Sequence, residues 1–172
     1  MLRLTLLTMV FVSCVGVGMY LGGIYGFRLD DLKRFKKGLL ILRSDIDHLG
    51  TPLQEALHNL ALKLGQQHQV SQLFAHTAAA IATQQFPDQA LNESLAHHQH
   101  RLYLSPEDHE TLRAFGQTLG YLDKHLQLES IALTVAYLDE RIAQETANRL
   151  KYTKLYQTLG VLAGLLVLVL FI

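Results

Sequence analysis

The hydrophobic positions in the last third of the chain predict one long helix whose surroundings change along its length. In the first part of Asp123–Ile172, apolar residues follow steps of 3, 4, 3 and 4, which keeps them in one stripe on a helix. From Leu159 onward no polar side chain occurs, as expected for a helix surrounded by lipid. No proline interrupts the segment, so we predict a helix of about 75 Å that begins in water and ends in a membrane. The stripe consists of Leu128, Ile131, Val135, Leu138 and Ile142.

A second apolar run lies near the other end of the chain. Leu4–Phe27 contains no charged residue over 24 positions, and a helix of that length extends about 36 Å, enough to cross a bilayer with some tilt. A signal peptide instead has an apolar region of about 7–15 residues before a small-residue cleavage site, and no such site follows here. We therefore predict a retained transmembrane anchor over residues 1–28 and a second transmembrane helix over residues 155–172.

Glycines recur at intervals of four in both predicted spans. Small residues at this spacing allow helix backbones to approach closely in lipid, although glycine is also simply common in membrane helices. The first interpretation predicts a packing seam, either between the two spans or between subunits. Its residues are Gly18, Gly22 and Gly26 in the first span, and Gly160 and Gly164 in the second.

The charges that flank the two spans predict their orientation. Only Arg3 and the amino terminus precede the first span, whereas basic residues follow it closely and also precede the second span. Positively charged residues near span ends stay on the cytoplasmic side. Both termini are therefore expected on the outer side of the membrane, with residues 29–154 forming one cytosolic insert. The inner flanking residues are Arg28, Lys33, Arg34, Lys36, Lys37, Arg149, Lys151 and Lys154.

The insert reads as a series of helices separated by short loops. Residues 30–48, 69–84 and 88–98 each carry apolar residues on one side, and glycines at 50, 65 and 120 end helices. Thr51 is expected as the N-cap of a helix with Pro52 in its first position, and Gln54 could complete a capping box. Ser105 and the following Pro106-Glu107-Asp108 repeat this start with two acids in the first turn. We predict an all-α fold, a roughly six-helix antiparallel bundle flanked by N- and C-terminal transmembrane helices.

Charge and composition exclude several functional classes. Lys plus Arg and Asp plus Glu are each 15, and no basic stripe of the kind that binds nucleic acid is visible. The single cysteine, Cys14, lies within the first apolar run and has no partner for an internal disulfide. Neither a phosphate-binding Gly-x-x-x-x-Gly-Lys-Ser/Thr loop nor a Gly-x-Ser-x-Gly nucleophile motif occurs. We predict that the protein is not an enzyme and has no catalytic residues and no cofactor.

Histidines provide the one alternative chemistry. His97, His98 and His100 lie close together in the sequence, but no cysteine accompanies them and the nearest acid is Glu93, so a closed metal site would need distant ligands. We therefore assign no metal ligands. The alternative function is a membrane-anchored sensor whose histidine-rich turn responds to a metal or to pH near 6.

Three short elements, in order, resemble the stage III sporulation protein AB family. Residues 49–57 (LGTPLQEAL) are similar to its TPL-x-EAL element. Residues 115–127 (FGQTLGYLDKHLQ) are similar to its LG-x-x-LG…D-x-x-x-Q element, with Leu122 where a serine is common. Residues 155–160 (LYQTLG) lead into a terminal apolar tail, as in the family. The sequence lacks the family's usual tryptophan near the fourth helix.

This resemblance implies a membrane platform component of a secretion-like channel complex that connects the mother cell and forespore during endospore formation. The family is related to the helical cytoplasmic domain of type II secretion inner-membrane platform proteins. The resemblance implies a location in the mother-cell outer forespore membrane, with a secretion-type ATPase and other channel membrane proteins as partners. Capping and core packing offer a competing explanation for part of the expected contact surface. The expected partner-binding residues are Thr51, Pro52, Leu53, Leu57, Leu119, Gly120, Asp123 and Gln127.

Overall fold

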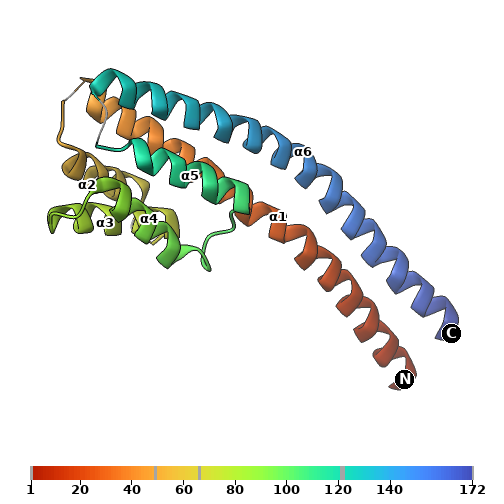
Figure 1. Cartoon of the computed structure of the whole chain (residues 1–172). Helices are drawn as coiled ribbons and strands as arrows, with labels where there is room; N and C mark the ends of the chain where they lie inside the picture. The colour runs from red at the N-terminus through yellow and green to blue at the C-terminus, as the bar shows by residue number, and fades with distance from the viewer. Residues whose placement is uncertain (1, 49, 66, 121–122, 172) are drawn as a thin grey trace. The chain divides into compact units, whose positions relative to one another are not determined.

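The computed structural model describes residues 2–48, 50–65, 67–120 and 123–171, and within them side-chain surroundings mainly for residues 26–149. This described part is all-α, as predicted, and contains six helices (Figure 1). Residues 30–48 continue the first apolar segment without a break, and the last helix runs uninterrupted almost to the end of the chain. The helices are α1 (Leu2–His48), α2 (Leu53–Leu64), α3 (Gln69–Ala82), α4 (Pro87–His98), α5 (Pro106–Thr118) and α6 (Lys124–Phe171).

The chain divides into two compact units. Unit 1 comprises residues 1–29 and 143–172, and unit 2, the bundle, comprises residues 30–142. Each of the two long helices therefore contributes one part to each unit. This division reflects which segments of the chain pack against each other. The boundaries predicted from the sequence (1–28, 29–154 and 155–172) instead mark where the chain would enter and leave a membrane. Those boundaries stay a prediction.

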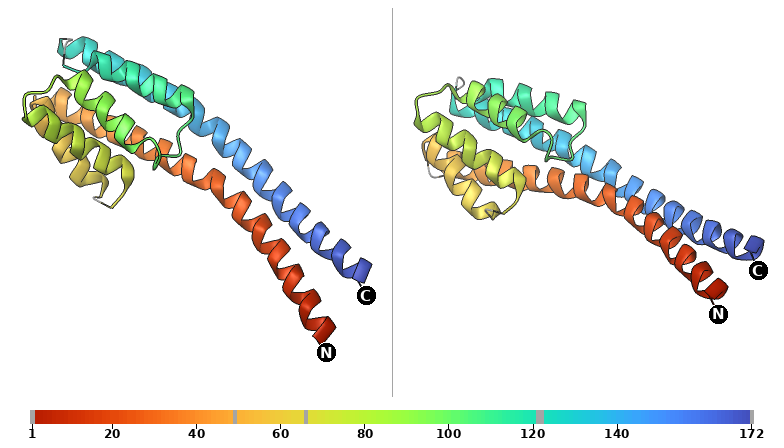
Figure 2. Two further views of the ribbon diagram at one scale, coloured as in Figure 1. Left: turned by 60° about the horizontal axis from the view of Figure 1, so that its bottom comes forward. Right: turned by 90° about the horizontal axis from the view of Figure 1, so that it is seen from below.

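The bundle core is formed by the apolar stripes that the sequence shows. Consecutive helices of unit 2 alternate in direction, and α2 to α5 pack each on the next (Figures 1 and 2). The Phe35 and Phe74 rings meet edge to face with centroids 5.7 Å apart, which joins α1 to α3. Ile131 and Leu138 bring the α6 stripe into the same core. The other fully buried large side chains are Leu32, Leu39, Leu42, Leu57, Leu60, Leu73, Val70 and Thr77.

The predicted cap at Thr51 is wrong. Helix α2 begins at Leu53, its N-cap position is Pro52, and no side chain caps it. Pro52 has an extended backbone (φ −53°, ψ 142°), so Thr51 lies one residue too early to reach the free N–H groups of the first turn. The Thr51 N–H donates instead to the Asp45 carbonyl, 3.3 Å away at the end of α1.

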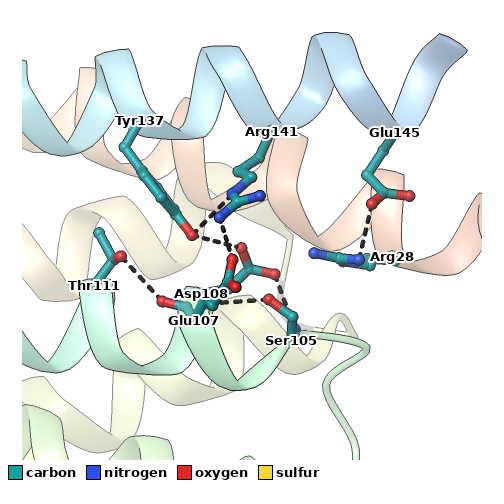
Figure 3. Close-up of polar contacts among 8 residues, drawn as sticks. All are labelled: Arg28, Ser105, Glu107, Asp108, Thr111, Tyr137, Arg141 and Glu145. Carbon is teal, nitrogen blue, oxygen red and sulfur yellow. Dashed lines mark hydrogen bonds and ion pairs between the residues drawn. The ribbon is translucent and has the colours of Figure 1, made fainter. Parts of the chain in front are cut away.

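The predicted start of α5 is confirmed and includes a full capping box. The Asp108 N–H donates to Ser105 Oγ (3.1 Å), and Asp108 Oδ2 accepts from the Ser105 N–H (2.8 Å). The buried Asp108 carboxylate also accepts from the Tyr137 hydroxyl of α6 (3.1 Å), and Arg141 donates to the same hydroxyl (3.0 Å) (Figure 3). Arg141 also forms an ion pair with Glu107. This network fixes α6 against the first turn of α5.

In unit 1, the described contacts join the two chain segments near their polar ends. Arg28 Nη1 lies 2.8 Å from Glu145 Oε1 (Figure 3), and a side-chain carbon added at Gly26 would meet the Arg149 guanidinium at 3.5 Å. Gly26 therefore faces the other segment of this unit. The surroundings of the other four glycines of the predicted seam (Gly18, Gly22, Gly160 and Gly164) lie outside the described side chains.

Among the residues that the structure describes, no helix combines the length and the apolarity that crossing a membrane requires. Most side chains of Leu4–Phe27 and Leu155–Ile172 lie outside that part. The two spans therefore stay a prediction from the sequence.

Candidate partner-binding end of the bundle

The two halves of the expected contact surface meet at one end of unit 2. Lys124, in the first turn of α6, donates to the Asp47 carbonyl at 2.6 Å and lies 3.4 Å from the Asp47 carboxylate near the end of α1. This contact places Asp123 and Gln127 at the same end of the bundle as Thr51 and the start of α2. We call this region the turn end; it comprises residues 47–48, 50–53, 84–87, 118–120 and 123–127.

The start of α4 completes the turn end. Gly120 has φ +84°, a conformation that favours glycine, and a carbon added there would lie only 2.6 Å from Pro87 Cγ. The chain after α5 therefore packs directly on the first residue of α4. A 2.6 Å hydrogen bond between the Thr118 and Ser130 hydroxyls joins the end of α5 to α6. The turn end is thus held by contacts among four helices.

The expected partner-binding residues divide into two groups by exposure. Leu57 and Leu119 are 1% and 3% exposed and belong to the core, so a partner has no access to them in this structure. Leu53 is half-buried and packs against the same core. The residues that solvent reaches are Thr51, Pro52, Gly120, Asp123 and Gln127.

Asp123 has a structural role as well as an exposed position. Its Oδ1 accepts from the Leu126 N–H at 2.9 Å, and its carbonyl accepts from the Gln127 N–H at 3.0 Å. This is the geometry of a helix N-cap. A carboxylate here also lies at the positive end of the α6 dipole. Any test of a binding role must therefore preserve the cap.

Two exposed apolar side chains at the turn end were missed by the sequence analysis. Phe86 is 58% exposed directly before Pro87, and Leu126 is 44% exposed in the first turn of α6. The available signals were weak, because Phe86 lies between two helices directly before a proline and Leu126 lies off the apolar stripe of α6. Together with Asp123 and Gln127, they give this end the mixed apolar and polar character of a protein-binding surface.

A polar pocket elsewhere in unit 2 shows no arrangement suited to catalysis. The pocket has a volume of about 640 Å³ and includes Arg34 and His68 in its lining. Arg34 Nε donates to Asp30 at 2.8 Å, and His68 Nε2 lies 3.2 Å from Asp30 Oδ2 and 3.6 Å from Asp31 Oδ1. Burial raises the pKa of the Asp31 carboxyl, an effect opposed by the Tyr103 N–H that donates to it. The pocket's charged groups thus pair with neighbouring side chains of the bundle.

The histidine cluster differs from the one that the sequence suggested. The His97 ring lies beside the rings of His98 (5.1 Å between centroids) and His76 of α3 (5.4 Å), and His76 lies 6.1 Å from His98. His100 instead approaches the side chain of Gln99 at 3.3 Å. Within the described ranges, no three His, Cys, Asp or Glu side chains are arranged to hold a metal ion. The metal part of the alternative function therefore has no supporting geometry.

His98 should make the stability of the bundle pH-dependent. Its side chain is 6% exposed and its Nδ1 is buried without a hydrogen-bond partner. Burial lowers the pKa of the imidazole below its ordinary value of 6.5, and the positive charges of His97, His76 and Arg101 lower it further. The unfolded chain therefore binds this proton first, so the free energy of unfolding should fall as the pH drops below about 6.5.

Urea unfolding of the full chain at about pH 7 and at about pH 5 measures this effect. His98→Phe removes the titrating group and should reduce the loss of stability between the two pH values. Exposed His100 provides the control, and His100→Gln should leave the loss unchanged. Burial also lowers the pKa of His109, which adds a loss of the same sign in every variant. An unchanged loss in His98→Phe would contradict the prediction.

The comparisons with known proteins identify one family, and two of them extend across nearly the whole chain. The family model described as "Stage III sporulation protein AB" matches residues 3–172. The stage III sporulation protein AB of Bacillus subtilis (strain 168) is 29% identical over 171 residues, which cover 99% of each chain. A solved structure of a stage III sporulation protein AB superposes with a TM-score of 0.66 and 26% identity, covering 73% of this chain and 98% of that one.

Proposed function

The chain belongs to the stage III sporulation protein AB family, and from this premise we propose that it is a non-enzymatic membrane platform in a mother cell–forespore channel complex. The observation that carries the proposal is the family match across residues 3–172, which supports a role in sporulation. The finer assignment to a secretion-like complex rests on the three sequence elements at residues 49–57, 115–127 and 155–160. In this proposal the protein transmits position or force and performs no chemistry.

Two membrane anchors hold the platform in the mother-cell outer forespore membrane, with the bundle in the cytosol. The support is the 24-residue uncharged segment Leu4–Phe27, the apolar C-terminal segment Leu155–Ile172, and the basic residues on their inner flanks. Other membrane proteins of the channel contact these spans, and the glycines at intervals of four form the packing seam.

A secretion-type ATPase binds the turn end. The support is physical: this end gathers polar and apolar side chains that solvent reaches, among them exposed Asp123 and Phe86 and half-buried Gln127. Because α6 begins at the turn end and continues to residue 171, a displacement of its first turn can be carried along one continuous helix. Leu57 and Leu119 support this surface from the core and do not contact the ATPase.

Vesicle flotation tests anchoring and ATPase binding together. The full chain reconstituted into liposomes should float with the lipid, and the ATPase should float only when the chain is present. The double variant Asp123→Asn/Gln127→Ala should reduce ATPase recovery by about tenfold, the loss expected from one central contact of about 1–2 kcal/mol. Asparagine keeps the oxygen that caps α6, so the helix start is preserved.

A matched variant at the opposite end of the bundle controls for general effects. Glu110→Gln/Gln99→Ala removes the same charge and the same amide from exposed positions near the start of α5 and the end of α4. It should leave recovery unchanged. A chain that stays with the soluble fraction refutes membrane anchoring, and equal ATPase recovery with both variants refutes the turn end as the binding surface.

A further inference from the structure

In unit 2, the neighbouring outer faces of α1 and α6 are held in a defined register. Lys36 Nζ lies 2.5 Å from Asp139 Oδ1, and Lys124 pairs with Asp47 further along the same two helices. The helices are antiparallel, so these two pairs place Leu40 of α1 level with Leu133 of α6. These two ion pairs therefore determine which residue of α6 lies at the same level as each exposed residue of α1.

Apolar side chains lie at the centre of this outer face. Leu133 is 68% exposed and Leu40 is 43% exposed, at the same level on adjacent helices. Ala136, one turn along α6 from Leu133, is also exposed. A single exposed leucine is ordinary, but two leucines at one level beside an alanine form a small apolar patch.

The charges on either side of this patch have opposite signs. The outer face of α1 carries exposed Lys33, Lys37 and Arg43, and its exposed acid Asp30 is paired with Arg34 of the same helix. The outer face of α6 carries exposed Glu129 and Glu140. One face of the bundle thus has a basic half, an apolar centre and an acidic half. Such a surface is complementary to a second copy of itself.

We propose that two copies of this chain associate through the outer faces of α1 and α6, with each α1 packed on the partner copy's α6. The two-fold axis of this dimer lies between the two copies and runs parallel to α1 and α6. It places the basic half of each copy on the acidic half of the other. In the register set by Lys36–Asp139 and Lys124–Asp47, the axis brings Leu40 of one copy onto Leu133 of the other. It also brings Arg43 close to Glu129, and Lys33 close to Glu140.

Other packings of the same face are less favourable. A two-fold axis perpendicular to the helices would place α1 on the α1 of the other copy in the reverse direction, and would bring basic residues together, Lys33 of one copy near Arg43 of the other. Like charges brought together in this way oppose association. The face is distinct from the turn end, so dimer formation does not depend on the ATPase contact.

Charge reversal tests the dimer. The molecular mass of the full chain in mild detergent, measured by light scattering over a range of concentrations, should show a monomer–dimer equilibrium. Arg43→Glu and Glu129→Arg should each weaken dimerisation by about tenfold or more, because each replaces two attractive pairs by two repulsive ones. Both substitutions alter exposed side chains, and unchanged circular dichroism would verify that the fold is intact.

Mixing the two single variants provides the decisive measurement. A heterodimer of Arg43→Glu and Glu129→Arg chains restores both attractive pairs, so the mixture should dimerise to within about threefold of the original protein. The variant Asp123→Asn/Gln127→Ala should dimerise normally. A monomer at all concentrations overturns the proposal. A dimer that both reversals leave intact also overturns it, because the contact then lies elsewhere, for instance in the predicted glycine seam.

Discussion

Gly120→Ala should lower the free energy of unfolding by about 2–4 kcal/mol. Alanine at φ +84° costs about 1–2 kcal/mol in backbone strain, and its Cβ would lie 2.6 Å from Pro87 Cγ, an overlap that adds about 1–3 kcal/mol. The overlap arises at the turn end, where the chain after α5 packs on the start of α4. Urea unfolding of the full chain, followed by circular dichroism, measures the change.

Gly65 provides a closely matched control. Its φ is +89°, but nothing lies within 4 Å of an added carbon, so Gly65→Ala should show the backbone cost alone. The difference between the two alanine variants then isolates the Pro87 overlap. Pro87→Ala removes the nearest atom and should recover part of the loss when combined with Gly120→Ala. Equal destabilisation by Gly120→Ala and Gly65→Ala would show that Pro87 moves aside without a loss of stability.

Asp108→Ala should lower the free energy of unfolding by about 2–4 kcal/mol. The substitution removes the acceptor of the Ser105 N–H and the acceptor of the Tyr137 hydroxyl, and both bonds end on a carboxylate that is fully buried. A buried donor left unpaired costs about 1–3 kcal/mol, and loss of a cap costs about 1 kcal/mol. The effect should be visible as a lower midpoint in urea with an unchanged slope.

Two further variants separate the parts of this network. Tyr137→Phe removes only the hydroxyl and should cost about 1 kcal/mol. Asp88 lies in the first turn of α4, whose N-cap Phe86 has no capping side chain, and Asp88 Oδ1 has no hydrogen-bond partner. Asp88→Ala should therefore cost only the interaction with the helix dipole, about 0.3–1 kcal/mol. A loss at Asp88 equal to that at Asp108 would mean that the network with Tyr137 contributes nothing.

The two substitutions probe opposite ends of the same pair of helices. Gly120 lies where α5 ends, whereas Asp108 lies where α5 begins and contacts α6 through Tyr137. If α6 transmits a displacement from the turn end, the Asp108–Tyr137 contact determines how firmly its first part is held against α5. The largest stability effects are therefore expected at the two ends of α5.

The local features of the fold were predictable from the sequence because they depend on helix geometry. A period of 3.6 residues identifies the stripe that must be buried, and Leu32, Phe35 and Leu39 are buried as their spacing indicates. The start of α5 was predictable for the same reason, since Ser105, Pro106 and the two acids of the first turn are neighbours in the sequence. The family resemblance also depended on short local elements, and the match across the chain confirmed it.

Contacts between distant segments were decided by the tertiary structure. Lys124 meets the Asp47 carbonyl across 77 positions, and no periodicity specifies which turn of one helix lies beside which turn of another. The grouping of His76 with His98 depends in the same way on how α3 packs on α4. Thr51 does not cap α2 as expected, because the backbone of Pro52 is extended and the helix begins only at Leu53. The sequence by itself determined which faces are buried and where most helices stop, because helical period and end signals are local. The structure decided which surfaces come together, because that depends on the packing of whole helices.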